Sequence, residues 1–257
     1  MLILRSLNLE NYFMVIDIST DAAELGKKAA AFSGMILRET IKQNGEARLL
    51  LSTGSSQFET LSALLNEKVE WRKIEIFHLD EYIGLPSTHK ASFRKYLNDR
   101  FISKINAKKF YGVDTEGNPE DCIARLSSEI RKKQVDLALI GIGVNGHIAF
   151  NDPPADFDTR ESFRVVKLDD TCRRQQVDEG WFEKVDEVPQ QAVSMTPWQI
   201  MQSKTIVSCV PHKVKARAVK DTLSNTTTRL IPATLLKEHS DFHLFIDTAS
   251  ASEIIHL

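Results

Sequence analysis

Short, nearly continuous apolar runs alternate with longer amphipathic segments along most of the chain. Such runs are typical of strands buried on both faces, and the amphipathic segments are typical of helices that cover a sheet. The pattern predicts strands at residues 13–18, 48–52, 74–79, 135–140, 192–195, 205–210 and 242–246. It predicts helices over about residues 21–43, 58–65, 92–103 and 213–222, with a further helix that starts at Asn118-Pro119. The alternation predicts an α/β fold: a single-domain, doubly wound, mainly parallel open sheet of the Rossmann-like kind.

One region departs from this alternation. Residues 155–185 are highly charged and contain only short apolar runs. We interpret them as an excursion over the surface rather than as core, and we expect them to form a lid within a single domain that spans residues 1–257.

Composition narrows the choice of partner. The 257 residues carry 33 lysines and arginines against 35 acidic residues, so the net charge of -2 gives no reason to expect nucleic acid or an acidic membrane surface. No apolar run approaches the length of a transmembrane helix. The three widely spaced cysteines argue against a disulfide framework and against a zinc site, which favours a reduced, cytoplasmic setting. The expected partner is a small molecule.

The segment that follows the strand at residues 135–140 combines glycines with polar side chains. Gly141, Gly143 and Gly146 form the pattern G-x-G-x-x-G, which in dinucleotide-binding proteins requires a helix to begin at the last glycine. Here Pro153-Pro154 follows too closely for a regular helix, so nucleotide binding is disfavoured. The glycines instead predict a loop whose backbone approaches a ligand closely. Its polar side chains are Asn145, His147, Asn151 and Asp152.

A second candidate loop joins the strand at residues 48–52 to the next helix. Its hydroxyl groups and backbone N–H groups can face an anion, or they can simply cap the helix. The loop lacks the G-K-[ST] ending of a nucleotide P-loop, and its candidate phosphate ligands are Thr53, Gly54, Ser55 and Ser56.

An acidic pair ends the predicted strand at residues 74–79. Asp80 and Glu81 could form a solvated turn. However, the carboxyl ends of parallel strands meet at one edge of a sheet, which brings Asp80 toward His147. A carboxylate and a histidine at one site can share the work of proton transfer.

Together these loops resemble a known family. The motifs occur in the order LSTGSSQ, FHLDEYIGLPSTHKASF and DLALIGIGVNGHIAFNDP. In that order they resemble the glucosamine-6-phosphate deaminases, also called glucosamine-6-phosphate isomerases, whose superfamily includes galactosamine-6-phosphate isomerases and 6-phosphogluconolactonases. The resemblance continues through AVSMTPWQIMQSKTIVSCVPHKVKARAV and PATLLKEHSDFHLFID, and so covers almost the whole chain. The F-N that follows G-H-I-A is similar to the deaminase branch rather than the lactonase branch.

The resemblance implies a cofactor-free, metal-free conversion of glucosamine 6-phosphate and water to fructose 6-phosphate and ammonia. It implies that His147 opens the sugar ring, that Asp80 moves a proton from C2 to C1, and that Asp152 and Asn145 assist His147. It also implies that the phosphate lies on residues 53–56 with Lys215 and Arg173, where Arg174 could replace Arg173. Glu81 and Gly146 are expected in the same pocket.

Three departures from the family pattern affect the choice of substrate. Position 145 is Asn, where one branch of the family has Asp and another has Asn. Asp152 stands where Glu is usual, and Ser55 and Gln57 stand where Gly and Pro are usual. A 6-phosphogluconolactonase-like hydrolase, a galactosamine-6-phosphate isomerase and a non-catalytic sugar-phosphate sensor therefore remain as alternatives. The sequence also leaves open whether the chain forms a homo-oligomer.

Overall fold

Strands and helices alternate as the hydrophobic pattern predicted. The computed structural model describes residues 3–7 and 13–254, so residues 1–2, 8–12 and 255–257 of the predicted domain lie outside the described part. The strands are β1 Ile3–Leu7, β2 Phe13–Ser19, β3 Ala47–Leu51, β4 Ile74–His78, β5 Asp80–Tyr82, β6 Lys109–Tyr111, β7 Leu137–Leu139, β8 Phe163–Lys167, β9 Gln191–Met195, β10 Thr205–Val210 and β11 Asp241–Asp247. The helices are α1 Ala22–Asn44, α2 Phe58–Leu64, α3 Phe93–Arg100, α4 Pro119–Ile130, α5 Asp170–Asp178, α6 Pro197–Met201 and α7 Ala216–Ser224.

Two of the predicted helices, over residues 21–43 and from Asn118-Pro119, have capped ends near the predicted bounds. Asp21 caps α1, accepting a hydrogen bond from the backbone N–H of Glu24 at 2.8 Å, and Gly45 ends the helix in the left-handed conformation. Asn118 caps α4, whose first residue is Pro119. These predictions are confirmed. No helix within residues 3–7 and 13–254 is both long and apolar enough to cross a bilayer.

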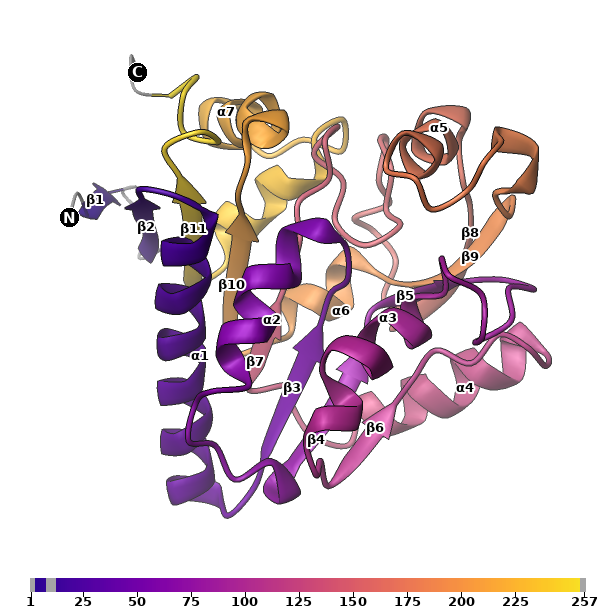
Figure 1. The fold of residues 1–257 in the computed structure, drawn as a ribbon, viewed down its shortest axis with the longest axis horizontal. Coiled ribbons are helices and arrows are strands. Elements are labelled where there is room, and N and C mark those ends of the chain that lie inside the picture. The colour runs from indigo at the N-terminus through magenta and orange to yellow at the C-terminus, as the bar shows by residue number, and fades with distance from the viewer. Residues whose placement is uncertain (1–2, 8–12, 255–257) are drawn as a thin grey trace.

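The large sheet has eight strands in the order β1-β2-β11-β10-β7-β3-β4-β6. β1 pairs antiparallel with β2, and all other neighbours pair in parallel. Its central strands are buried on both faces (Figure 1). In β3, Leu49 and Leu51 pack with α1, α2 and α3, whereas Leu50 faces the opposite core, which α4, α6 and α7 cover. The predicted doubly wound, mainly parallel α/β fold is therefore confirmed.

A second sheet corrects the interpretation of residues 155–185. Strands β5, β9 and β8 form a three-stranded antiparallel sheet, and α5 packs beside it. Phe163, Leu168 and Phe182 are buried, at 1%, 3% and 5% exposure, so the prediction of a surface excursion without core residues was wrong. The apolar residues are separated by charged ones because each element buries only one face.

The order of the strands defines one crevice. From β3 the chain moves outward through β4 to β6, then returns at β7 beside β3 and moves the other way to β10 and β11. The loops after β3 and β7 therefore diverge at their carboxyl ends, which is where ligands bind in open α/β sheets.

Candidate active site

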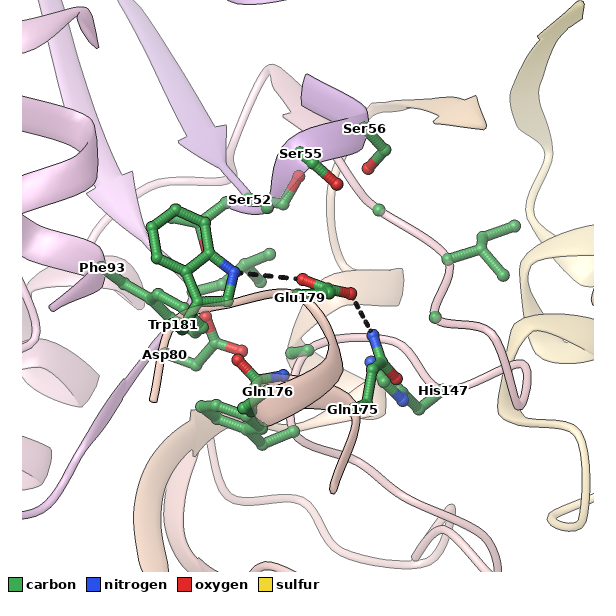
Figure 2. Close-up of a pocket in the computed structure, with 18 of the residues that line it drawn as sticks. Ser52, Ser55, Ser56, Asp80, Phe93, His147, Gln175, Gln176, Glu179 and Trp181 are labelled. Atoms are coloured by element: carbon green, nitrogen blue, oxygen red, sulfur yellow. Dashed lines mark hydrogen bonds between the residues drawn. The ribbon is translucent and has the colours of Figure 1, made fainter. Parts of the chain in front are cut away.

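A polar cavity lies at this crevice. The loop after β3 supplies residues 52–56, and the loop after β7 supplies Gly141, Ile142, Gly143, His147, Ala149 and Phe150. The remaining lining residues are Leu79, Asp80, Phe93, Gln175, Gln176, Glu179, Trp181 and Lys215. Figure 2 shows Asp80, His147 and the serines of the first loop around this one cavity. The structure thus brings together the three loops that the sequence singled out.

Asp80 is a buried carboxyl group at the start of β5. It lies opposite Ser194 of β9 and is only 5% exposed. The pKa of Asp80 is raised to about 8: burial is the largest cause, the neighbouring Glu81 charge acts in the same direction, and the N–H of Phe150 acts against both. A carboxyl whose pKa lies this near to neutrality can both take up and return a proton at physiological pH.

His147 faces Asp80 from the loop after β7. Its ring packs on Gly143, where a Cβ atom would lie 2.3 Å from the ring, so only glycine fits at position 143. His147 Nδ1 lies 3.2 Å from Asp152 Oδ1, which is an ion-pair distance, although the two groups are not aligned as a hydrogen bond. This contact leaves Nε2 as the ring nitrogen that a ligand can use.

Asp152 and Asn145 stand behind the histidine. Asn145 Nδ2 donates to Asp152 Oδ1 at 3.4 Å, and Asn145 Oδ1 accepts from the backbone N–H of His147 at 3.1 Å. Burial by itself would raise the pKa of Asp152, but His147, Asn145 and Cys172 together hold it below its ordinary value. Asp152 is therefore ionised at neutral pH and favours a positive charge on His147.

The predicted phosphate loop lines the opposite end of the cavity. Gly54 has a φ of 101°, and its carbonyl accepts a hydrogen bond from the Tyr96 hydroxyl at 2.8 Å. Gln57 donates to Ser56 Oγ at 3.1 Å and to the carbonyl of Cys209 at 3.2 Å, which ties the loop to β10. The Thr53, Ser55 and Ser56 hydroxyls are thus held at the cavity by a loop fixed from two sides.

Lys215 supplies positive charge to this end of the cavity. It lies just before α7 and is only 9% exposed, and burial lowers its pKa. It is the only lysine or arginine among the described residues that line the cavity.

Arg173 lies outside the cavity. Its guanidinium donates to the carbonyl oxygens of Val185 at 2.6 Å and Val188 at 3.3 Å, so it fixes the loop after α5, and Arg174 is exposed. The structure does not bring either arginine to the phosphate loop.

Four further residues that the sequence analysis did not identify also line the cavity. They are Gln175, Gln176, Glu179 and Trp181. Glu179 accepts hydrogen bonds from Gln175 Nε2 at 2.7 Å and Trp181 Nε1 at 3.1 Å, as Figure 2 shows. The spacing of four between Gln175 and Glu179 places them on one helical face, a pattern that could have pointed to them.

Glu81 and Gly146, predicted in the pocket, instead support its walls. The buried Glu81 carboxylate accepts from Ser92 Oγ and from the Arg94 backbone N–H, both at 2.8 Å, and so fixes the start of α3. Gly146 has a φ of 81°, and a Cβ there would lie 2.8 Å from Ile231 Cγ2.

This combination defines a doubly wound α/β protein with a ligand cavity at its switch point, equipped for proton transfer. Residues 20–245 match the family described as glucosamine-6-phosphate isomerases/6-phosphogluconolactonase, and the chain belongs to that family.

Individual relatives agree with this assignment. The chain is 33% identical over 253 residues to a glucosamine-6-phosphate deaminase of Thermoanaerobacter sp., covering 94% of this chain and 95% of the relative. It is 33% identical to glucosamine-6-phosphate deaminase 1 of Bacillus subtilis, covering 88% and 95%.

Solved structures share the fold. A structure of a monomeric glucosamine-6-phosphate deaminase superposes with a TM-score of 0.84 at 31% identity, covering 93% of this chain and 99% of the other. A 6-phosphogluconolactonase from Thermotoga maritima superposes with a TM-score of 0.75 at 19% identity, covering 91% and 99%, which supports the fold alone.

Proposed function

We propose that this protein is a glucosamine-6-phosphate deaminase, which converts glucosamine 6-phosphate and water to fructose 6-phosphate and ammonia. One observation carries the proposal: a single cavity holds a buried carboxyl of raised pKa and a histidine that is paired with a separate carboxylate. Moving a proton between two carbons next to a carbonyl needs a base near carbon and an acid near oxygen. Asp80 and His147 fit these two roles.

His147 serves the ring-opening step. Its Nε2 takes the proton from the anomeric hydroxyl, the ring C1–O5 bond breaks, and the ring oxygen receives a proton from the same imidazole. Asp152 and Asn145 fix the ring of His147, and the negative charge of Asp152 favours the imidazolium that forms between the two transfers.

Asp80 serves the carbon step. Its carboxylate removes the C2 proton of the open-chain aldehyde and returns that proton to C1, while the aldehyde oxygen gains a proton and the amino group gives one up, leaving a C1 hydroxyl and an imine at C2. Water then adds to C2 and ammonia leaves, so the atoms of substrate and water balance those of the products. The high proton affinity of Asp80 suits a carbon acid, because a base of ordinary carboxylate pKa would take that proton less readily.

The other end of the cavity suits a phosphate group. Thr53, Ser55, Ser56 and Lys215 line the cavity together, and Figure 2 shows Ser55 and Ser56 on the side of the cavity away from Asp80. Binding a group remote from the reacting carbons helps to position those carbons.

Two assays test the proposal: a coupled assay of ammonia release from glucosamine 6-phosphate and galactosamine 6-phosphate, and an assay of hydrolysis of 6-phosphogluconolactone. We expect ammonia from glucosamine 6-phosphate, and a loss of at least about 10²- to 10⁴-fold in Asp80→Asn with binding of the sugar phosphate retained. Asp178→Asn, at an exposed position of α5, is the matched control. Lactone hydrolysis without ammonia release, or full activity of Asp80→Asn, would contradict the proposal.

A further inference from the structure

Gln176 is held in a single orientation at the wall of the cavity. It lies in α5, lines the same cavity as Asp80 and is only 6% exposed. Its Oε1 accepts a hydrogen bond from the Tyr82 hydroxyl at 2.7 Å. In this orientation the Oε1 end of the amide faces Tyr82, and the Nε2 end faces away from it.

Tyr82 is itself fixed by its surroundings. It is fully buried, and its ring packs against Phe93 and Phe150 at centroid distances of 5.1 Å and against Phe182 at 5.7 Å. Tyr82 follows Asp80 by two residues in β5, so both side chains lie on the same face of that strand. Strand β5, which carries the Asp80 carboxyl, therefore also carries Tyr82, the residue that orients the amide of Gln176.

The opposite end of the amide is free. Within the described residues, Gln176 Nε2 donates no hydrogen bond, although the side chain is almost completely enclosed and faces the cavity. Nε2 is not one of the side-chain nitrogen and oxygen atoms that are sealed from solvent without a partner, so it is open to the cavity, where a ligand can accept its hydrogen bond.

We propose that Gln176 is a substrate-positioning residue whose Nε2 donates a hydrogen bond to a sugar hydroxyl next to the carbons at which Asp80 acts. This inference rests on the proposed function and specifies how the site recognises the sugar chain. A neutral amide suits this place because it leaves the charge of Asp80 unchanged, whereas a lysine or arginine there would lower the proton affinity that the base needs.

Deoxy substrates test this contact directly. We expect Gln176→Met, which keeps length and shape but lacks the donor, to lower kcat/KM for glucosamine 6-phosphate by about 5- to 100-fold. With either the 3-deoxy or the 4-deoxy analogue, the same substitution should have little further effect, because the accepting hydroxyl is already absent. Losses of equal size on the parent sugar and on both analogues would overturn the proposal.

Two further variants separate positioning from stability. Tyr82→Phe releases the amide, so we expect a smaller loss on the same substrate, and no additional loss when it is combined with Gln176→Met. Asp178→Ala, exposed on the same helix, should match the wild type. If the two losses add fully, Tyr82 does not act through Gln176 and the proposal fails.

Calorimetric binding of the same three sugar phosphates distinguishes this inference from the proposed function. If the wild type releases no ammonia, the proposed function fails, yet selective weakening of binding by Gln176→Met still supports the contact. If ammonia is released but Gln176→Met binds and turns over all three sugars like the wild type, only the inference on Gln176 fails.

Discussion

The surroundings of two buried aspartates in the site shift their pKa values in opposite directions. Asp80 is buried next to the Glu81 charge, and its pKa rises to about 8. Asp152 is also buried, but His147 and Asn145 contact it, and its pKa falls. Carboxyl pairs that are separated in this way are typical of sites that need one group to exchange protons and another to remain charged.

Asp80→Asn should stabilise the fold increasingly as the pH rises. In the wild type, Asp80 has a pKa of about 8 in the folded protein and of 3.8 in the unfolded chain, so the unfolded chain ionises first as the pH rises. The contribution of Asp80 to the free energy of unfolding is therefore complete below pH 3.8 and is lost between that pH and about 8. Asparagine does not ionise, so the free energy of unfolding of the variant should exceed that of the wild type by more than about 1 kcal/mol at pH 8. Urea unfolding at pH 5 and pH 8 measures this, and a difference that is the same at both values would contradict it.

Asp152→Asn should slow ring opening selectively. It preserves shape but removes the negative charge that favours the imidazolium of His147. We expect a large loss of activity on the closed-ring aminosugar phosphate and a smaller loss on an acyclic analogue, measured as kcat/KM for each. Asp152→Glu, which restores the residue usual in the family, is the companion variant and should retain activity if the pocket accommodates one more methylene. Equal losses on both substrates would assign Asp152 to holding the loop.

At the scale of elements, the segment after α5 places a negative charge where a phosphate is expected. Glu179 lines the cavity with Ser55, Ser56 and Lys215, and it acts on Lys215 by raising its pKa against the effect of burial. A phosphate bound in this cavity is repelled by the Glu179 carboxylate, and the N–H donors of Gln175 and Trp181 could serve either group.

Substitutions of Lys215 and of Glu179 should therefore change the affinity for a sugar phosphate in opposite directions. Lys215→Ala should weaken binding of a sugar phosphate strongly and raise KM, because it removes the positive charge from a nearly buried site. Glu179→Gln should tighten binding, because it removes the like charge and keeps the hydrogen-bonding shape. Calorimetry with fructose 6-phosphate at two salt concentrations measures both. Weaker binding by Glu179→Gln would mean that Glu179 contacts the substrate instead.

Residues 155–185 are expected to act as a lid when the sugar phosphate binds. The Glu179 carboxylate must move or rearrange when a phosphate binds to the loop after β3. The helix that precedes Glu179, α5, carries two other residues of the cavity wall, Gln175 and Gln176. Limited proteolysis should then show slower cleavage within 155–185 on adding fructose 6-phosphate, with no such protection in Lys215→Ala. Cleavage that is equally fast with and without the ligand would argue against a lid.

At the scale of the whole molecule, the sequence predicted the strands of the large sheet except β1 and β6, but of the small sheet it predicted only β9. Strands such as β3 and β10 are apolar throughout because helices cover both their faces, so each is visible in its own residues. β5 has three residues and β8 carries charges, and their partner β9 is remote in sequence, so only the tertiary structure makes them strands.

The same difference between local and tertiary signals explains which site residues could be predicted from the sequence. Asp80, His147 and the serines of the loop after β3 follow predicted strands, so their meeting at one sheet edge could be predicted. Gln176 and Trp181 reach the cavity only because α5 packs beside the small sheet. Arg173 and Glu81 have the residue types of ligands, but hydrogen bonds within the protein direct them elsewhere.

The two sheets should unfold as one unit. Residues of the small sheet, including Phe163, Val193 and Met195, belong to the same core cluster as the strands of the large sheet, and Met195 N donates to the carbonyl of Leu79 at 2.8 Å. A variant with Trp71→Phe and Trp198→Phe retains Trp181 as its one tryptophan, beside the small sheet. Its fluorescence and the far-ultraviolet circular dichroism of the whole chain should then give coincident urea transitions. A fluorescence transition at clearly lower urea would show that the small sheet and α5 unfold separately, and the shared core would not couple them.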